Sequence, residues 1–338
     1  MGNRVLQEDV VQFANHFELK NSLHNSLFLI TGATGFIGST LIRCLLALEQ
    51  NIRIIAPVRN KGKALQMFES ENNSVSFIEC DLQTYNYTNI GHVDYIIHCA
   101  SPTSGKYMEN YPLETYNFAY ATTYNLLNYA KEYNIKGVVY LSSLEYYGQV
   151  LEDKIIDENY IGFVNPCSSR SSYPMGKRST EYLCFCFANE YNIPVKIARL
   201  TQTFGAGIAN SDNRVFAQFV RSVINNQDII LHTYGQSSKP YCYSTDCISG
   251  ILYILLKGVS GEAYNVANES TYISIIKLAE LLRDTFNPNI DVRIELNDKM
   301  GYAPVTKLRL SVKKLESLGW QPKYELKQMF ERLIISLR

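Results

Sequence analysis

The chain has 338 residues, and 46% of them are hydrophobic, which is enough for a sizeable core in one large domain or two unequal ones. Basic and acidic residues both number 32, so the charge gives no reason to expect nucleic acid or an anionic membrane as a partner. No apolar run approaches about 18 residues, so we expect no transmembrane helix. The charged N-terminal segment lacks the pattern of a signal peptide.

Eight cysteines are spread along the chain without a C-x-x-C pair, mostly in apolar surroundings. This distribution predicts buried free thiols and a reducing cytoplasm. The five histidines show no metal-ligand spacing, and no metal site is expected. The cysteines are Cys44, Cys80, Cys99, Cys167, Cys184, Cys186, Cys242 and Cys247.

Residues 3–20 are predicted to form an amphipathic helix, with Val5, Leu6, Val10 and Phe13 on one stripe. Short continuous apolar runs follow, as expected of strands that are covered on both faces of a parallel sheet. They lie at 26–31, 52–58, 75–80, 93–100, 137–143 and 195–200, with helical patterns at 36–50, 110–133 and 172–191. This alternation predicts right-handed crossovers and an α/β fold, a Rossmann-type doubly wound parallel sheet.

The alternation loosens after residue 200. Helices are predicted at 213–225, 244–257 and 273–286, strands at 229–232 and 263–267, and a last helix at the C-terminus. We therefore predict an N-terminal helical extension at 1–25, a dinucleotide-binding domain at 26–200, and a smaller lobe at 201–338 that mainly binds substrate. The chain is expected to cross back from this lobe to the sheet, whose carboxyl edge is the expected ligand site.

The segment "TGATGFIG" at 31–38 follows the first predicted strand and opens the first long helix. Glycine lets the backbone turn tightly and approach a diphosphate, while the helix N-terminus offers N–H groups and a positive dipole end. We therefore predict a dinucleotide cofactor at this turn. The expected contacts are Gly32, Thr34, Gly35, Phe36, Ile37 and Gly38.

The G-x-x-G-x-x-G spacing resembles the short-chain dehydrogenase/reductase superfamily, in the extended branch that holds nucleotide-sugar epimerases, dehydratases and decarboxylases. The resemblance covers nearly the whole chain after residue 26, and it implies NAD(P) as the cofactor. It also implies that Asp81 and Leu82, in "ECDL", lie at the adenine, and that Ala100, in "HCAS", lines the cofactor.

The choice of dinucleotide depends on the end of the second predicted strand, which reads "APVRNKGK" at 56–63. An NAD-preferring member would usually carry an acid there to hold the ribose hydroxyls. This chain has Arg59, Lys61 and Lys63 and no acid in that segment. Positive charge favours a 2′-phosphate, so NADP is preferred and NAD stays open.

Tyr173 and Lys177 stand four residues apart in "SSYPMGKRSTE", on one face of a predicted helix. The lysine ammonium is expected to lower the pKa of the tyrosine, and a cationic nicotinamide ring would add to this. Such a tyrosine can take the proton of a substrate hydroxyl while hydride leaves the same carbon. The resemblance adds Ser143 as hydrogen-bond partner of the reacting oxygen, whereas Ser142 is expected to bond the backbone.

The presence of Glu145 near Ser143 in the sequence indicates a reaction step beyond hydride transfer. In 4,6-dehydratases of this superfamily the serine or threonine is followed by Asp-Glu, and in UDP-glucuronate decarboxylases by Ser-Glu. Here Leu144 precedes Glu145, and a leucine cannot protonate a leaving hydroxide, which argues against 4,6-dehydration. Glu145 is predicted to assist a second step; the alternative is a loop carboxylate that caps or forms a salt bridge.

Further substrate contacts follow from the resemblance. Arg214 and Lys239 are implied at the nucleotide diphosphate, with Lys239 in place of the usual arginine, which keeps the charge but loses the bidentate fork. Gln202 replaces an asparagine that contacts substrate. Arg309 matches an arginine of some decarboxylases, and it could meet a carboxylate or phosphate or lie at the surface.

The chain is accordingly predicted to be an enzyme that oxidises a nucleotide-linked sugar at C4 and then converts the ketone. Epimerisation ranks first, decarboxylation second and 4,6-dehydration third, and NADPH-dependent reduction of a nucleotide-linked keto-sugar or alditol also fits. A cofactor-binding regulator without turnover is the alternative from another class. The resemblance further implies a homodimer through the helices at 110–133 and 172–191.

Overall fold

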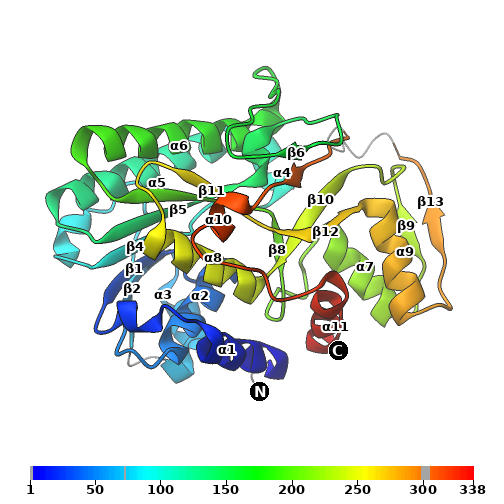
Figure 1. Ribbon diagram of the computed structural model, residues 1–338, viewed down its shortest axis with the longest axis horizontal. Helices are drawn as coiled ribbons and strands as arrows, with labels where there is room; N and C mark the ends of the chain where they lie inside the picture. The colour runs from blue at the N-terminus through cyan, green and yellow to red at the C-terminus, as the bar shows by residue number, and fades with distance from the viewer. Residues whose placement is uncertain (1–2, 72–73, 298–304) are drawn as a thin grey trace.

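The computed structural model describes residues 3–71, 74–297 and 305–338, and its centre is a parallel sheet of seven strands in the order β11-β7-β5-β4-β1-β2-β3 (Figure 1). Each neighbouring pair is parallel, which confirms the predicted doubly wound α/β fold. The strands are β1 Leu27–Thr31, β2 Arg53–Val58, β3 Val75–Glu79, β4 Tyr95–His98, β5 Gly137–Ser143, β7 Val195–Leu200 and β11 Ala263–Val266.

Helices cover both faces of this sheet, which is why its strands are apolar throughout (Figure 1). In β1, Phe28 and Ile30 belong to the core under α2 and α8, while Leu29 belongs to the core under α5 and α6. The helices are α2 Phe36–Ala47, α5 Pro112–Glu132, α6 Ser172–Tyr191 and α8 Ser244–Lys257. A short helix, α3 Lys61–Met67, was not predicted; the Asn60 side chain accepts the Lys63 N–H and starts it.

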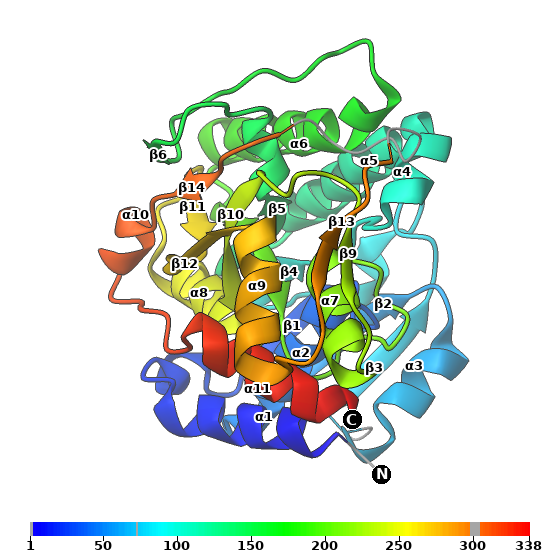
Figure 2. The same ribbon diagram turned by 90° about the vertical axis from the view of Figure 1, so that its right-hand side faces the viewer.

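The second half of the chain builds its own apolar core around Phe204, Phe216 and Phe330. Its elements are a three-stranded sheet of β8 Gln202–Phe204, β10 Ser238–Tyr243 and β12 Asn268–Ser274, a parallel pair of β9 Ile229–Leu231 and β13 Val292–Ile294, and the helices α7 Val215–Ile224, α9 Ile275–Phe286 and α11 Leu326–Leu337 (Figure 2). The sequence analysis missed β8, β10, β12 and β13. From this lobe α8 and β11 return to the large sheet. The exact division into domains stays a prediction.

The N-terminal helix α1, Arg4–His16, is shorter than predicted, and it lies against α2, α8 and α11 (Figure 2). Its Val5, Val10 and Phe13 are buried, as the stripe predicted, whereas Leu6 is only half-buried. Asp9 is also buried; its carboxylate accepts the Tyr243 hydroxyl at 2.5 Å and Nε of Arg332 at 2.6 Å. The helix therefore joins the first-half core to the end of β10 and to α11.

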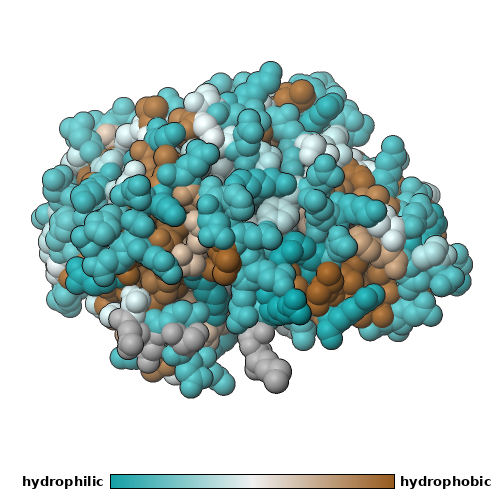
Figure 3. Space-filling model, turned by 60° about the horizontal axis from the view of Figure 1, so that its bottom comes forward, coloured by the Kyte–Doolittle hydropathy of each residue, from teal (hydrophilic) through white to brown (hydrophobic). Residues whose placement is uncertain are grey.

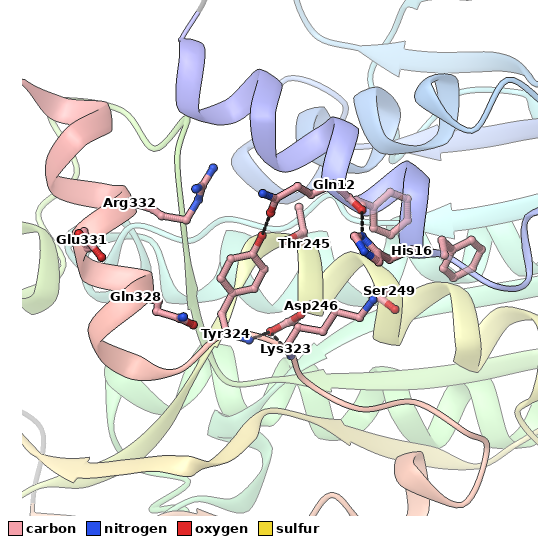
Figure 4. Close-up of a pocket in the computed structure, with 12 residues that line it drawn as sticks. Gln12, His16, Thr245, Asp246, Ser249, Lys323, Tyr324, Gln328, Glu331 and Arg332 are labelled. Atoms are coloured by element: carbon pink, nitrogen blue, oxygen red, sulfur yellow. Dashed lines mark hydrogen bonds between the residues drawn. The ribbon is translucent and has the colours of Figure 1, made fainter.

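A pocket of about 400 Å³ opens between α1, α8 and α11, where the Tyr324 hydroxyl donates to Gln12 at 2.9 Å (Figure 4). The surrounding face of the molecule is mostly hydrophilic, with separate hydrophobic patches (Figure 3). In the part of the chain that the structure describes, no helix is both long and apolar enough to cross a membrane. All eight cysteines are free, as predicted. Four are buried, three are half-buried, and the prediction of burial is wrong for the exposed Cys167.

Candidate active site

The glycine-rich turn between β1 and α2 has a shape that only glycine permits. Gly32 has a φ of +70°, and a Cβ there would lie 2.7 Å from the backbone nitrogen of Ala100. A Cβ on Gly38 would lie 2.2 Å from the Gly32 carbonyl oxygen. Because Gly35 is the N-cap of α2 and has no side chain, the first N–H groups of the helix stay available for an anion. The turn fits a dinucleotide diphosphate, with Thr34, Phe36 and Ile37 partly accessible beside it.

The segment next to this turn, at the end of β4, is fixed by the buried side chain of His98. Its Nδ1 lies 2.6 Å from Thr31 Oγ1 and its Nε2 lies 3.2 Å from Thr122 Oγ1. The Thr31 hydroxyl also accepts the Ala100 N–H at 3.2 Å, which fixes that half-buried residue at the turn. Burial lowers the pKa of His98 to about 3, so this histidine is neutral and joins β1, β4 and α5.

At the expected adenine end, Arg59 is exposed after β2, and Lys61 and Lys63 are exposed on the first turn of α3. Asp81 is also exposed, and its carboxylate accepts the Gln83 N–H at 2.9 Å. The Leu82 side chain, by contrast, is 6% exposed and packs into the core under α5 and α6. Any contact of Leu82 with a cofactor would therefore come from its backbone.

An acid that the sequence analysis missed lies at the same end of the sheet. Glu79 ends β3 directly beside Val58, the last residue of β2, and its carboxylate accepts the Lys61 N–H at 2.7 Å. The sequence alone did not reveal it because it belongs to the next strand. The order of parallel strands could have indicated it, since their carboxyl ends meet at one edge.

The structure brings together Ser143, Tyr173 and Lys177. Tyr173 lies in the first turn of α6, and its hydroxyl is hydrogen bonded by Ser143, at the end of β5, and by Ser101. One turn later, Nζ of the buried Lys177 donates to the Leu141 carbonyl at 2.7 Å and lies 5.4 Å from the centre of the Tyr173 ring. Ser101 was not among the predicted site residues.

The pKa of Tyr173 differs from the expectation. Burial raises it above its usual value and the nearby Glu145 carboxylate raises it further, against the hydrogen bonds from Ser143 and Ser101. The expected lowering by Lys177 is not seen, because the ammonium points to the Leu141 carbonyl. Lys177 itself has its pKa lowered to about 8 by burial, against the opposing effect of Glu181.

Glu145 lies in the short 3-10 turn Leu144–Tyr147, two residues after Ser143 at the end of β5. Water reaches its side chain, yet protein surrounds it closely enough that burial raises the pKa of the carboxyl. The charges of Lys239, Arg170 and Lys177 oppose this rise in the pKa of Glu145. The alternative was a loop carboxylate that caps a turn or forms a salt bridge. Among the described residues, however, no partner lies within hydrogen-bond distance of the Glu145 carboxylate.

The residues expected at the substrate phosphates gather on β8, α7 and β10. Lys239, on β10, is half-buried and makes no ion pair within the described residues; burial lowers its pKa, which Glu145 opposes and Arg214 reinforces. Arg214 is the N-cap of α7 and is already paired with Asp212 at 2.6 Å. Gln202 is half-buried on β8, in register with Tyr241 of β10.

Arg309 lies on a separate strand that packs against β10. It lies in a short strand, β14 Arg309–Leu310, which pairs with β6 Ile155–Ile156. Its side chain is exposed, and the guanidinium lies 5.6 Å from the centre of the Tyr272 ring. Its segment lies beside Ser238 of β10, next to Lys239, so a contact with a carboxylate or phosphate and a surface role both stay predictions.

Behind the site lies a buried polar network that the sequence analysis also missed. Arg199 on β7 and Glu181 on α6 form an ion pair at 2.7 Å, with side chains 4% and 6% exposed. Ser142 donates to the Glu181 carboxylate, so the expectation that it bonds the backbone is wrong. Arg199 also donates to the Tyr147 hydroxyl at 3.0 Å and stacks 3.5 Å from the centre of the Tyr146 ring.

Solved structures with the same fold include two nucleotide-sugar epimerases. A UDP-glucose 4-epimerase from Thermotoga maritima, crystallised with UDP-glucose, aligns with a TM-score of 0.80 at 21% identity, over 92% of this chain and 98% of that one. A UDP-glucuronic acid 4-epimerase from Bacillus cereus, in complex with NAD, aligns with a TM-score of 0.76 at 20% identity, again over 92% and 98%. These likenesses confirm the fold.

The sequence relatives are closer. UDP-glucuronic acid decarboxylase 5 of Arabidopsis thaliana is 29% identical over 316 residues, which are 90% of this chain and 87% of that protein. UDP-glucuronic acid decarboxylase 1 of Xenopus tropicalis is 27% identical over 90% of this chain and 70% of its own. Residues 28–267 match the model of the NAD dependent epimerase/dehydratase family. The chain belongs to that family, and it is an NAD(P)-dependent enzyme.

The ammonium of Lys177 lies 4.7 Å from the centre of the Tyr140 ring, so two aromatic rings stabilise its charge. We expect kcat/KM to fall as the pH rises through about 8, because Lys177 then loses its proton. Tyr140→Leu should move this fall to lower pH by about one unit, since a buried cation–π contact is lost.

Tyr140→Phe keeps the ring and serves as the matched control, with a profile like that of the wild type. The measurement is the pH dependence of kcat/KM for the three proteins. If kcat/KM of Tyr140→Leu fell at the same high pH as that of the wild type, the ring would not stabilise the charge of Lys177.

Proposed function

We propose that this enzyme oxidises a hydroxyl of a nucleotide-linked sugar, at C4, and then converts the resulting ketone in the same cleft. The observation that carries the proposal is the shared position of Ser143, Tyr173 and Glu145 beside the half-buried cation Lys239. A tyrosine and serine alone would serve simple redox chemistry. A second carboxyl and a cation that can take a phosphate suit a charged nucleotide substrate with a further step.

In the first step Tyr173 takes the proton of the sugar hydroxyl while Ser143 holds the same oxygen by a hydrogen bond. Bound NAD(P)+ would accept the hydride from the carbon, and its positive ring would favour ionised Tyr173. The turn at Gly32, Gly35 and Gly38 holds its diphosphate. Nζ of Lys177 lies 5.4 Å from the centre of the Tyr173 ring, and its hydrogen bond to the Leu141 carbonyl ties this turn of α6 to β5.

In the second step Glu145 moves a proton at the carbon beside the ketone, and the hydride that the cofactor would hold after the first step would return to C4 to complete the reaction. A ketone at C4 acidifies the neighbouring carbon and weakens a bond to a carboxylate there, so several outcomes are chemically open. Burial raises the pKa of Glu145, which suits a carboxyl that alternately holds and releases a proton. Leu144 cannot supply the acid that 4,6-dehydration needs beside it. Epimerisation is our first candidate.

Decarboxylation is the second candidate, and it has specific support. The relatives at 29% and 27% identity are UDP-glucuronic acid decarboxylases. The cleft also carries more positive than negative charge around Glu145, which suits a sugar with a carboxylate. Both candidates begin with the same oxidation and differ only in the fate of the ketone.

The test is to incubate the enzyme and both cofactors with a panel of UDP-, dTDP-, GDP- and CDP-linked sugars, and to weigh the products by mass spectrometry. Epimerisation leaves the mass unchanged, decarboxylation removes carbon dioxide, dehydration removes water, and net redox shifts the mass by two hydrogens. We expect Tyr173→Phe to lose turnover by at least about a hundredfold.

Tyr173→Phe should keep its affinity for the cofactor, because the ring remains. Glu145→Gln should still form the reduced cofactor from the substrate but fail to complete the second step, which stopped-flow absorbance would detect. Full turnover in Tyr173→Phe would refute the proposal and favour a regulator that only binds the cofactor.

We infer that the enzyme prefers NADP to NAD. Support comes from the three exposed cations Arg59, Lys61 and Lys63 at the end of β2, which suit a 2′-phosphate. Glu79 opposes them, since its carboxylate lies at the start of α3 and would repel a phosphate there. The preference therefore depends on the balance between these charges.

Calorimetric Kd values for NADP and NAD test this balance. We expect Arg59→Gln to weaken NADP about tenfold, the value of a charge-assisted hydrogen bond, and to leave NAD nearly unchanged. Glu79→Gln should strengthen NADP, because a repulsive charge is removed. Tighter binding of NAD than of NADP by the wild type would overturn the preference.

We also infer a homodimer through α5 and α6, as the family resemblance suggests. Large apolar side chains stay exposed on both helices, and an apolar helix pair can bury them against its copy as a four-helix bundle. They include Leu113, Tyr120 and Tyr124 on α5, with 41–66% exposure, and Tyr182, Phe185 and Tyr191 on α6, with 42–69%.

Tyr182→Glu should therefore yield monomers in light scattering coupled to size exclusion, because a carboxylate would be buried in the bundle. Val11→Glu, on α1 and 56% exposed, is the matched control and should remain dimeric. A wild type that is monomeric at high concentration would exclude the dimer.

A further inference from the structure

The pocket between α1, α8 and α11 lies apart from the candidate active site (Figure 4). Its volume of about 400 Å³ is within the range of small-molecule sites. In the part of the chain that the structure describes, its lining shares no residue with the glycine-rich turn, the Tyr173 site or the group around Lys239. Both α1 and α11 also lie outside residues 28–267, which match the family model. The pocket therefore needs an explanation of its own.

Two buried polar groups from the first turn of α8 face this pocket. Thr245 is 4% exposed; it lies near the Tyr324 hydroxyl, yet its Oγ1 has no partner in hydrogen-bond geometry among the described residues. Asp246 is 3% exposed, and its Oδ2 accepts the N–H groups of Lys323 at 3.0 Å and Tyr324 at 3.1 Å. Because a buried polar group without a partner costs free energy, a ligand or water usually satisfies it. The floor of the pocket is therefore suited to a polar ligand.

The rim of the pocket adds hydrogen-bond donors and apolar surface. The exposed Lys323 side chain forms no ion pair within the described ranges and extends toward Ser249 (Figure 4). Oε1 of Gln12 accepts the Tyr324 hydroxyl at 2.9 Å, which leaves the N–H groups of this amide for another acceptor. Apolar contact is offered by the aromatic rings in the lining, which are those of Phe13, Phe17 and Tyr324.

We propose that this pocket is a second ligand site, which binds a neutral polyhydroxylated molecule such as a free sugar. A hydroxyl both donates and accepts hydrogen bonds, so one sugar can meet the Asp246 carboxylate, the Thr245 hydroxyl and the Lys323 ammonium. Burial raises the pKa of Asp246 to about 6, so at neutral pH it is mostly ionised and accepts. An anion would be repelled by Asp246 and Glu331, and a cation by Lys323 and Arg332.

A bound sugar would contact three parts of the molecule at once. Gln12 belongs to α1, Thr245 to α8, and Tyr324 to the segment that leads into α11. A ligand that binds only when these parts are together stabilises that arrangement by mass action. Amide hydrogen exchange in α1 should therefore slow down when the pocket is occupied.

Calorimetry with glucose, galactose and myo-inositol as probes tests the inference on the full-length protein. NADP and UDP are present at saturation, so that the catalytic cleft is filled. We expect at least one probe to bind, with one site per chain. Thr245→Val removes the buried hydroxyl at nearly constant shape and should weaken that probe at least about tenfold. Lys323→Ala, at an exposed side chain that folding does not need, should weaken it as well.

Ser244→Ala is the matched control and should leave the affinity unchanged. Ser244 precedes Thr245 on α8, and its buried hydroxyl also lacks a partner among the described residues, but it does not line the pocket. A wild type that binds none of the three probes would overturn the inference. So would a probe whose affinity is the same in the wild type, Thr245→Val and Lys323→Ala. Neither result touches the proposed function, because the turnover of nucleotide sugars is measured separately.

Discussion

The buried ion pair between Arg199 and Glu181 fixes the elements of the candidate site relative to one another. Glu181 lies on α6, the helix that carries Tyr173 and Lys177, and it accepts a hydrogen bond from Ser142 of β5. Arg199 reaches from β7 to Tyr147, in the turn that carries Glu145. A buried pair contributes little net stability, but its partners cannot separate without leaving an unpaired charge. The network therefore determines position more than stability.

The same burial that makes this geometry rigid also sets the charge states within the cleft. It lowers the pKa of Lys177 and raises those of Tyr173 and Glu145. Each group is thereby shifted toward its neutral form and depends on the others, and on ligands, to become charged. Substrate phosphates at Lys239 and a cationic nicotinamide ring would both change this balance, which links binding to proton transfer.

The N-terminal helix has a structural task that connects the two halves of the chain. Asp9 joins α1 to Arg332 on α11 and to Tyr243, the last residue of β10. β10 carries Lys239, while α2, which α1 also covers, begins at the glycine-rich turn. Packing of one helix against both elements holds Lys239 and the glycine-rich turn in a fixed relation.

The sequence by itself determined the elements whose signal is local. Continuous apolar runs predicted the parallel strands, glycines at 32, 35 and 38 predicted the turn that the backbone geometry requires, and four-residue spacing placed Tyr173 and Lys177 on one face of α6. These features follow from backbone sterics and helix periodicity, which act between near neighbours in the chain.

Only the tertiary structure determined the contacts between residues that are far apart in the sequence. Only the strand order puts Glu79 beside the end of β2, and only the packing of α6 on β5 and β7 turns Ser142 toward Glu181. Leu82 looked equivalent to other site residues in the sequence, yet its side chain packs into the core. Burial and long-range pairing set these outcomes, because they depend on which side chains meet after the chain has folded.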